Sequence, residues 1–309
     1  MPIGVRDNDW LRLTSDDLHQ FKVSDREFIS MRSFLLAAAM FATMTCARAA
    51  DMPDFLRGGF APVPVVRNWA GWYAGGQGSY TVANINLGAT EQSLVDFILR
   101  DSIIQGAASG LTVLGKQHEQ SFGFGGFVGR NWQWDDVVLG VEANYVHING
   151  LTASESNSIS RRIDNPMGQT LPAGHVDSFD VTVTGSAQLQ IKDVMTFRGR
   201  AGWVCGDFLP YAFGGLAVGR IAASRSATVV ADEFDVFNNN STFIGSIAQS
   251  ATDGRSNTYA PGWTAGLGTE IAMFGNLFAR VEWEYIRFVT VKGMQTEMNS
   301  AHLGIGYRF

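Results

Sequence analysis

The sequence predicts an all-β protein, an eight-stranded antiparallel up-and-down transmembrane β-barrel with long extracellular loops and short periplasmic turns. Three observations predict this fold. Blocks of alternating apolar and polar residues repeat from about residue 69 to the end of the chain. Short and long connections alternate between the blocks, as in barrels that cross a membrane with strands. Each block is also long enough for a tilted spanning strand, which needs about 9–11 residues.

The composition excludes several other classes of protein. Charged residues make up only 17% of the 309 residues and hydrophobic residues 46%, so the chain is too apolar for a disordered protein. The formal net charge of −6 provides no broad basic surface for nucleic acid, and we expect no such partner. After the first fifty residues, no run of 18 apolar residues predicts a membrane-spanning helix.

The N-terminal part of the chain is predicted to be processing sequence. Residues 31–49 combine a basic start, an apolar stretch and small residues at Ala47 and Ala49, which together predict a cleaved signal peptide. We place the cut after Ala49, with one residue later as the alternative. Because a signal peptide works at the start of a chain, we interpret the polar residues 1–30 as a mis-assigned, disordered extension, with translation beginning at Met31.

A linker and the barrel follow. Residues 50–67 contain prolines and lack periodicity, so they predict an extended linker, and residues 68–309 form the predicted barrel. The fourth strand could start earlier, near Phe179, and a count of ten strands stays open. The eight predicted strands cover 69–83, 119–132, 137–149, 186–205, 210–223, 258–272, 277–290 and 297–309.

The connections between these strands alternate in length. Short turns suited to tight hairpins cover 133–136, 206–209 and 273–276. Long loops are predicted at 84–118, 151–178 and 224–257, with a shorter one at 291–296. The stretch 91–100 within the first long loop could form a short helix. An even number of strands places both ends of the barrel on the periplasmic side.

Charged residues of both signs fall on the strand faces opposite the apolar ones. We expect these side chains to meet in the lumen, where an eight-stranded barrel has room for side chains but not for a wide channel. An unpaired buried charge is costly, so the charges should pair into a polar plug that fixes strand register; a narrow ion path is the alternative. The predicted network comprises Glu142, Arg198, Arg200, Arg220, Glu270, Arg280, Glu282, Glu284 and Arg308.

Other chemistry is not indicated by the sequence. The G-x-S-x-G, H-E-x-x-H, Walker A and C-x-x-C motifs do not occur, so we predict no enzyme, no cofactor and no metal site. His118 and His175 lie at the ends of long loops, and they could meet at the extracellular rim in a weak metal or haem contact. Solvated loop histidines are the simpler interpretation.

Several segments, taken in order, carry a family resemblance: NWAGWYAGGQGSY (68–80), GGFVGRNWQW (125–134), TFRGRAGW (196–203), LPYAFGGLAVG (209–219), GWTAGLGTE (262–270) and HLGIGYRF (302–309). In this order they resemble the small outer-membrane β-barrel proteins of alphaproteobacteria, porin-like relatives of the OmpA barrel domain. The resemblance covers residues 68–309. It implies a location in the outer membrane, contact with its lipid and lipopolysaccharide, and insertion by the outer-membrane assembly machinery. The terminal residues Leu303, Ile305, Tyr307 and Phe309 resemble the signal that this machinery reads.

The predicted function is therefore a structural or weakly conducting, porin-like role in the cell envelope, with a lumen mostly plugged by charge. The alternative is a surface receptor or adhesin that binds a ligand, such as a host surface or haem, through its long loops. A general diffusion porin needs more strands or a trimer. Association into a homo-oligomer also stays open.

Overall fold

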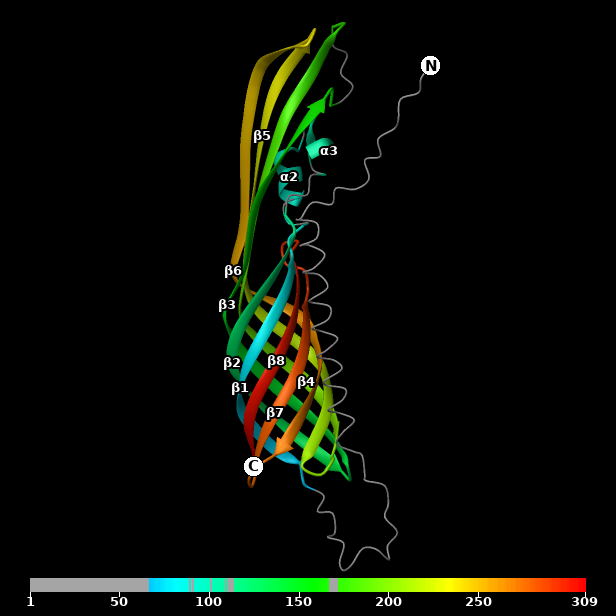
Figure 1. Cartoon of the computed structure of the whole chain (residues 1–309), viewed down its shortest axis with the longest axis vertical. Coiled ribbons are helices and arrows are strands. Elements are labelled where there is room, and N and C mark those ends of the chain that lie inside the picture. The colour runs from blue at the N-terminus through cyan, green and yellow to red at the C-terminus, as the bar shows by residue number, and fades with distance from the viewer. Residues whose placement is uncertain are drawn as a thin grey trace, which may run out of the picture. The chain divides into compact units, whose positions relative to one another are not determined.

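The computed structural model describes residues 67–309, apart from 89, 91, 101, 109, 111–113 and 167–171. In this part of the chain, eight antiparallel strands follow one another around a closed barrel, and β1 pairs with β8 to close it (Figure 1). The eight-strand prediction is confirmed, and the ten-strand alternative is wrong. The predictions for 1–30, for the signal peptide 31–49 with Ala47 and Ala49, and for 50–66 lie outside the described residues.

The strand order follows the sequence order, as in an up-and-down barrel. The helix expected within 91–100 is confirmed as α2. Among the described residues, no helix has the length and apolar character needed to span a membrane. The elements are β1 (Gly71–Asn86), α2 (Gln92–Ile98), α3 (Gln105–Ala108), β2 (Lys116–Trp134), β3 (Val137–Asp164), β4 (His175–Trp203), β5 (Phe208–Phe237), β6 (Asn240–Ala272), β7 (Leu277–Phe288) and β8 (Gln295–Arg308).

Two of the predicted long loops are wrong, because most of 151–178 and 224–257 is strand. β3, β4, β5 and β6 continue past the ends of β1, β2, β7 and β8 as a four-stranded antiparallel sheet (Figure 1). We call this part the projecting sheet. It consists of residues 151–164, 175–191, 223–237 and 240–255.

Register shifts lie at the base of the projecting sheet. They occur between His147 and Leu151 on β3, between Ile191 and Asp193 on β4, and opposite Ile221 and Ala223 in the β5–β6 pair. An extra residue in one strand of a pair moves the following side chains to the other face. On β3, even-numbered residues up to Ile148 point inward, whereas odd-numbered residues from Leu151 onward do so.

Apolar side chains form layers along the inner faces of the strands. One cluster, which includes Trp69, Phe127 and Phe278, fills the end of the barrel where the short turns lie. A second fills the opposite mouth of the barrel with aliphatic side chains such as Ile85 and Leu151. A third joins α2, α3 and the projecting sheet. Between the first two clusters lies the polar part of the lumen.

Candidate functional site

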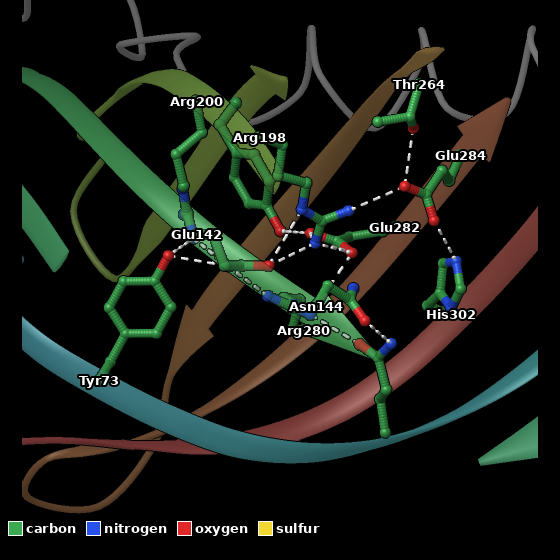
Figure 2. Close-up of polar contacts among 12 residues, drawn as sticks. Tyr73, Glu142, Asn144, Arg198, Arg200, Thr264, Arg280, Glu282, Glu284 and His302 are labelled. Atoms are coloured by element: carbon green, nitrogen blue, oxygen red, sulfur yellow. Dashed lines mark hydrogen bonds and ion pairs between the residues drawn. The ribbon is translucent and has the colours of Figure 1, made fainter. Parts of the chain in front are cut away.

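Most of the predicted lumen charges converge in the middle of the barrel (Figure 2). They come from four strands, β3, β4, β6 and β7, and all their side chains are almost completely buried. Alternation places them there, because every second residue of a strand faces the lumen. The converging residues are Glu142, Arg198, Arg200, Glu270, Arg280, Glu282 and Glu284.

Glu142 on β3 is the centre of this network. Its Oε1 accepts hydrogen bonds from Arg198, at 3.0 Å from Nε and 2.6 Å from Nη2. Its Oε2 accepts from Nη1 of Arg280 at 2.8 Å and from the hydroxyl of Tyr73 at 2.7 Å. Nη1 of Arg200 lies 3.4 Å from the same oxygen. One carboxylate therefore joins β1, β3, β4 and β7.

The carboxylates of β7 extend the network. Nη2 of Arg198 donates to both oxygens of Glu282, at 2.8 Å and 2.7 Å. Glu284 accepts from the hydroxyl of Thr264 at 2.7 Å, and its second oxygen lies 3.0 Å from Nε2 of His302. Its Oε1 is also 3.4 Å from Nη1 of Arg198. The polar contacts thus continue from the centre of the lumen to β8.

Glu270 on β6 has its own arginine. Its Oε1 accepts from Nη1 of Arg200 at 2.6 Å. Four buried glutamates are therefore paired with three buried arginines. The attraction between opposite charges at these distances compensates the cost of removing each group from water. Removing one partner would leave a buried charge uncompensated.

Aromatic rings cover the guanidinium planes. Arg280 lies 3.4 Å from the ring centre of Phe127, Arg200 lies 3.8 Å from that of Tyr211, and Arg198 lies 4.0 Å from that of Phe213. Such contacts attract a cation to the electron-rich face of a ring and exclude water. The charged layer is therefore packed against aromatic rings on the side of the short turns, and the aliphatic layer lies on its other side, at the opposite mouth of the barrel. Aromatic, charged and aliphatic side chains therefore follow one another along the described lumen.

Comparisons with known proteins place this closed, eight-stranded barrel in a family. Residues 34–309 match the model of the outer membrane protein beta-barrel domain. The chain belongs to this family. It is an outer-membrane protein, and the predicted location is confirmed. Since the strands that span an outer membrane are joined by short turns on the periplasmic side, the projecting sheet stands on the outer side of the membrane.

Individual relatives of this outer-membrane barrel are distant. A 22 kDa outer membrane protein of Rhizobium leguminosarum bv. viciae is 24% identical over 259 residues, which is 81% of this chain and 82% of that protein. Neisserial surface protein A is 12% identical, with a TM-score of 0.30 over 78% of this chain and 98% of that one. Ail of Yersinia pestis, in complex with the heparin analogue sucrose octasulfate, is 12% identical, with a TM-score of 0.28 over 77% of this chain and 99% of that one.

Two predicted members of the lumen network of this outer-membrane barrel lie elsewhere. Arg220 belongs to the outer face of β5, where its Nη2 pairs with Asp193 at 2.5 Å, so its prediction as a lumen residue is wrong. The inward residues of β5 are the odd-numbered ones, such as Ile221. Arg308 is buried near the periplasmic end, where it donates to the carbonyl of Asn68 at 2.6 Å and lies over Trp69.

Sequence reasoning also missed several neutral members of the network. Tyr73 and Tyr211 donate hydroxyl groups to Glu142 and Glu282. Asn144 accepts from Gln77 at 2.9 Å, and Gln77 accepts from Nη2 of Arg280 at 2.6 Å. All of these neutral residues lie at lumen-facing positions of their strands. The alternation with a period of two that predicted the charged residues could therefore have predicted them as well.

The terminal residues of the outer-membrane barrel lie on its outer face. Leu303, Ile305, Tyr307 and Phe309 are all exposed, and the intervening residues from His302 to Arg308 point inward. Their role as an assembly signal stays a prediction. No group of three or more side chains that could hold a metal ion occurs in the part of the chain that the structure describes.

Proposed function

We propose that this protein is a non-conducting outer-membrane barrel, which serves as a closed structural anchor for the projecting sheet. The observation that carries the proposal is the buried network around Glu142, in which charges from opposite walls of the barrel pair across the lumen. In a water-filled channel these groups would be hydrated and apart. Here each arginine is held by carboxylates and covered by a ring.

The layers on either side of the network support the same proposal. An ion that enters from the outside would first meet the apolar layer that contains Ile85, Leu151 and Phe288. It would lose its hydration there without gaining a polar partner, which is costly. A transient opening would have to displace several buried side chains at once, since the interior is packed.

Planar-bilayer recording of the refolded protein tests this proposal, with heat-shifted gel mobility confirming that the same sample is folded. We expect no discrete conductance steps from the wild-type protein. A variant that carries E142A, R198A, R280A and E282A removes the central side chains, and in folded form it should conduct. Discrete steps from folded wild-type protein would contradict the proposal.

A second candidate function is a surface receptor or adhesin that uses the projecting sheet. The observation that favours it is the exposure of Phe243, Ile244 and Ile247 close together on β6, an edge strand of that sheet, because exposed apolar side chains that gather in one place mark contact surfaces. Replacing all three by serine should reduce the adhesion of expressing bacteria to cultured epithelial cells. Phe274→Ser, in an exposed periplasmic turn, is the matched control.

Haem binding by paired histidines receives no support from the geometry. Nδ1 of His118 contacts Oδ1 of Asn84 at 2.5 Å, near the last residue of β1 and the first residue of β2, at the barrel mouth opposite the short turns. His175 lies at the far end of β4, where it contacts Asp235 at 2.8 Å and stacks on Phe237. Each imidazole has its own partners, and the two histidines lie on different parts of the fold.

A further inference from the structure

The projecting sheet has two edge strands, and they differ in charge. β3 pairs with β4 along 151–164, and β6 pairs with β5 along 240–255 (Figure 1). Among the residues that the structure describes, no strand pairs with the other side of either segment. Residues 240–252 of β6 contain no charged residue and no proline. The edge of β3 carries four charges, from Glu155, Arg161, Arg162 and Asp164.

The uncharged edge of β6 is accessible to another strand. A free edge presents a row of backbone N–H and C=O groups that can pair with a further chain, and proteins usually prevent this with charge, proline or a covering segment. All residues from Asn240 to Ser250 are exposed, apart from the half-buried Gly245. From Gly245 to Arg255 the ladder with β5 is unbroken, so this edge can act as a template for one more strand.

Large apolar side chains accompany this edge. Phe243 packs against Phe234 of β5, with ring centres 5.6 Å apart. Ile247 lies toward α2, where it lines a small hollow together with Ile98 and Val229. Phe243 is nevertheless 57% exposed and Ile247 62%. A strand added to β6 would cover both, because side chains that lie opposite each other on neighbouring strands are in contact.

The membrane decides how two identical β6 edges can meet. All copies in one membrane point the same way, so their β6 strands could meet only in parallel, with the slanted and less stable hydrogen-bond pattern. In copies that are anchored in two facing membranes, the β6 strands run in opposite directions. Two identical edges can then form an antiparallel ladder about a twofold axis, with the same surface on both sides. Since residues 240–252 carry no charge, no like charges oppose each other along this ladder.

We propose that the free edge of β6 pairs with the same edge of a second copy of this chain in a facing membrane. The two projecting sheets then form one continuous antiparallel sheet, with the two β6 strands side by side at its centre, and hold the two outer membranes together. At about 3.3 Å per residue, residues 240–255 span about 50 Å, which sets the distance between the membranes. The charged edge of β3 ends this sheet on each side.

This inference rests on the second candidate function, in which the projecting sheet is adhesive, and it names a second copy of the chain as the partner. Failure of the inference can be distinguished from failure of that function, because vesicles that carry only this protein contain no epithelial surface. Conduction is a separate question, since the lumen network lies inside the barrel and the free edge of β6 lies beyond it.

Mixing two populations of vesicles tests the pairing. The full-length protein is refolded into phosphatidylcholine vesicles that contain a green or a red dye, and heat-shifted gel mobility confirms that each sample is folded. Two-colour fluorescence then measures clusters that contain both dyes. Wild-type vesicles should cluster, and cryo-electron microscopy should show their bilayers about 50 Å apart. Clustering of wild-type vesicles with protein-free vesicles would overturn the proposal, because the edge would then bind lipid instead of a second copy.

Two charged variants identify the partner strand. One carries A248K and S250K, and the other carries A248E and S250E, at exposed positions that face the uncharged Val230 and Thr228 of β5. Each variant should cluster with itself about tenfold less than the wild-type protein does, since like charges on adjacent strands repel each other. Vesicles with the lysine variant should cluster again with vesicles that carry the glutamate variant, because opposite charges then meet across the twofold axis.

The matched control carries S156K and S158K on the edge of β3. Both serines are exposed, so this variant adds the same charge to the other edge of the same sheet and should cluster as the wild-type protein does. The proposal is overturned if wild-type vesicles stay separate or if the control loses as much clustering as the β6 variants. It is also overturned if the lysine and glutamate variants fail to cluster with each other.

Discussion

The same four strands, β3 to β6, have opposite polarity in two regions of the molecule. Inside the membrane their inner faces carry ion pairs such as Glu142–Arg198, and their outer faces carry exposed apolar residues such as Leu216. In the projecting sheet, the inner faces carry buried aliphatic residues such as Val183, and the outer faces carry serine and threonine. The solvent on the outside explains the difference, because lipid surrounds one region and water the other.

This reversal also explains how each region is stabilised. In the barrel, apolar side chains gain little by leaving lipid for the lumen, so paired charges and hydrogen bonds join the walls. In the projecting sheet, burial of apolar area drives the packing of Leu94 and Val95 of α2 against Val181 and Val229. The two regions should therefore respond differently to the same kind of substitution.

The largest expected effect comes from Glu142→Ala in the barrel. It leaves three buried arginines short of a carboxylate, which should lower the free energy of unfolding by about 3–5 kcal/mol. Urea unfolding of the protein in lipid vesicles measures this loss. Glu142→Gln keeps the side-chain volume and one acceptor, so it should lower the free energy of unfolding less than the alanine variant does. A loss below about 1 kcal/mol for the alanine variant would show that the network does not stabilise the barrel.

A charge on the inner face of the projecting sheet should open that region alone. Val183→Asp buries an unpaired carboxylate among aliphatic side chains, at a cost of about 3 kcal/mol or more. Limited trypsin digestion should then cut at Arg161 or Arg162, while heat-shifted gel mobility shows an intact barrel. The neighbouring Thr184→Asp faces outward and is the control. Cleavage of both variants at equal rates would contradict the assigned faces.

Glycines on the two faces of β5 provide a smaller test. A Cβ on Gly215 would approach the carbonyl oxygen of Phe197 to 2.0 Å, whereas on Gly214 its nearest neighbour would be 3.6 Å away. Gly215→Ala forces β4 and β5 apart beside Arg198 and should cost about 1–3 kcal/mol. Gly214→Ala should be nearly neutral in the same urea experiment. Equal losses would show that the inner face has room to adjust.

The smallest effect concerns acid pH at the base of the projecting sheet. Hydrogen bonds from Lys292 and Arg225 lower the pKa of the Asp253 carboxyl. Because the pKa of Asp253 is lowered, this contact stabilises the folded protein fully at pH values above the ordinary pKa of an aspartate. The stabilisation is lost as the pH falls through the lowered pKa. Wild-type protein should become slightly more sensitive to an acid protease below about pH 4, and Asp253→Asn should remove that dependence. An unchanged pH profile in the variant would contradict the contact.

The barrel could be predicted from the sequence, because alternation with a period of two is regular there. Strand eight shows why: Leu303, Ile305 and Tyr307 alternate with inward residues without a break. The same pattern placed Glu142, Arg198 and Glu282 on inward positions. It could not show which arginine meets which glutamate, since that depends on the stagger between strands that are far apart in the sequence.

The projecting sheet could not be predicted in the same way. Its bulges near Leu151 and Lys192 change the phase of the alternation, so inward and outward positions exchange within one strand. Its outer face is rich in serine, which is also typical of loops. Arg220 is an even-numbered residue of β5, whose odd-numbered residues point inward without a break from Leu209 to Val229, so strict alternation would have placed it on the outer face.

The reversal of faces along β4 can be measured directly with spin labels carried by a non-natural amino acid. The accessibility of each label to oxygen, which concentrates in lipid, is compared with that to a water-soluble nickel reagent. We predict that labels at Met195 and Phe197 are reached by oxygen, and labels at Thr184 and Ser186 by nickel. Lipid contact at Thr184 and Ser186, or loop-like mobility there, would contradict the account of a sheet that leaves the membrane and exchanges its faces.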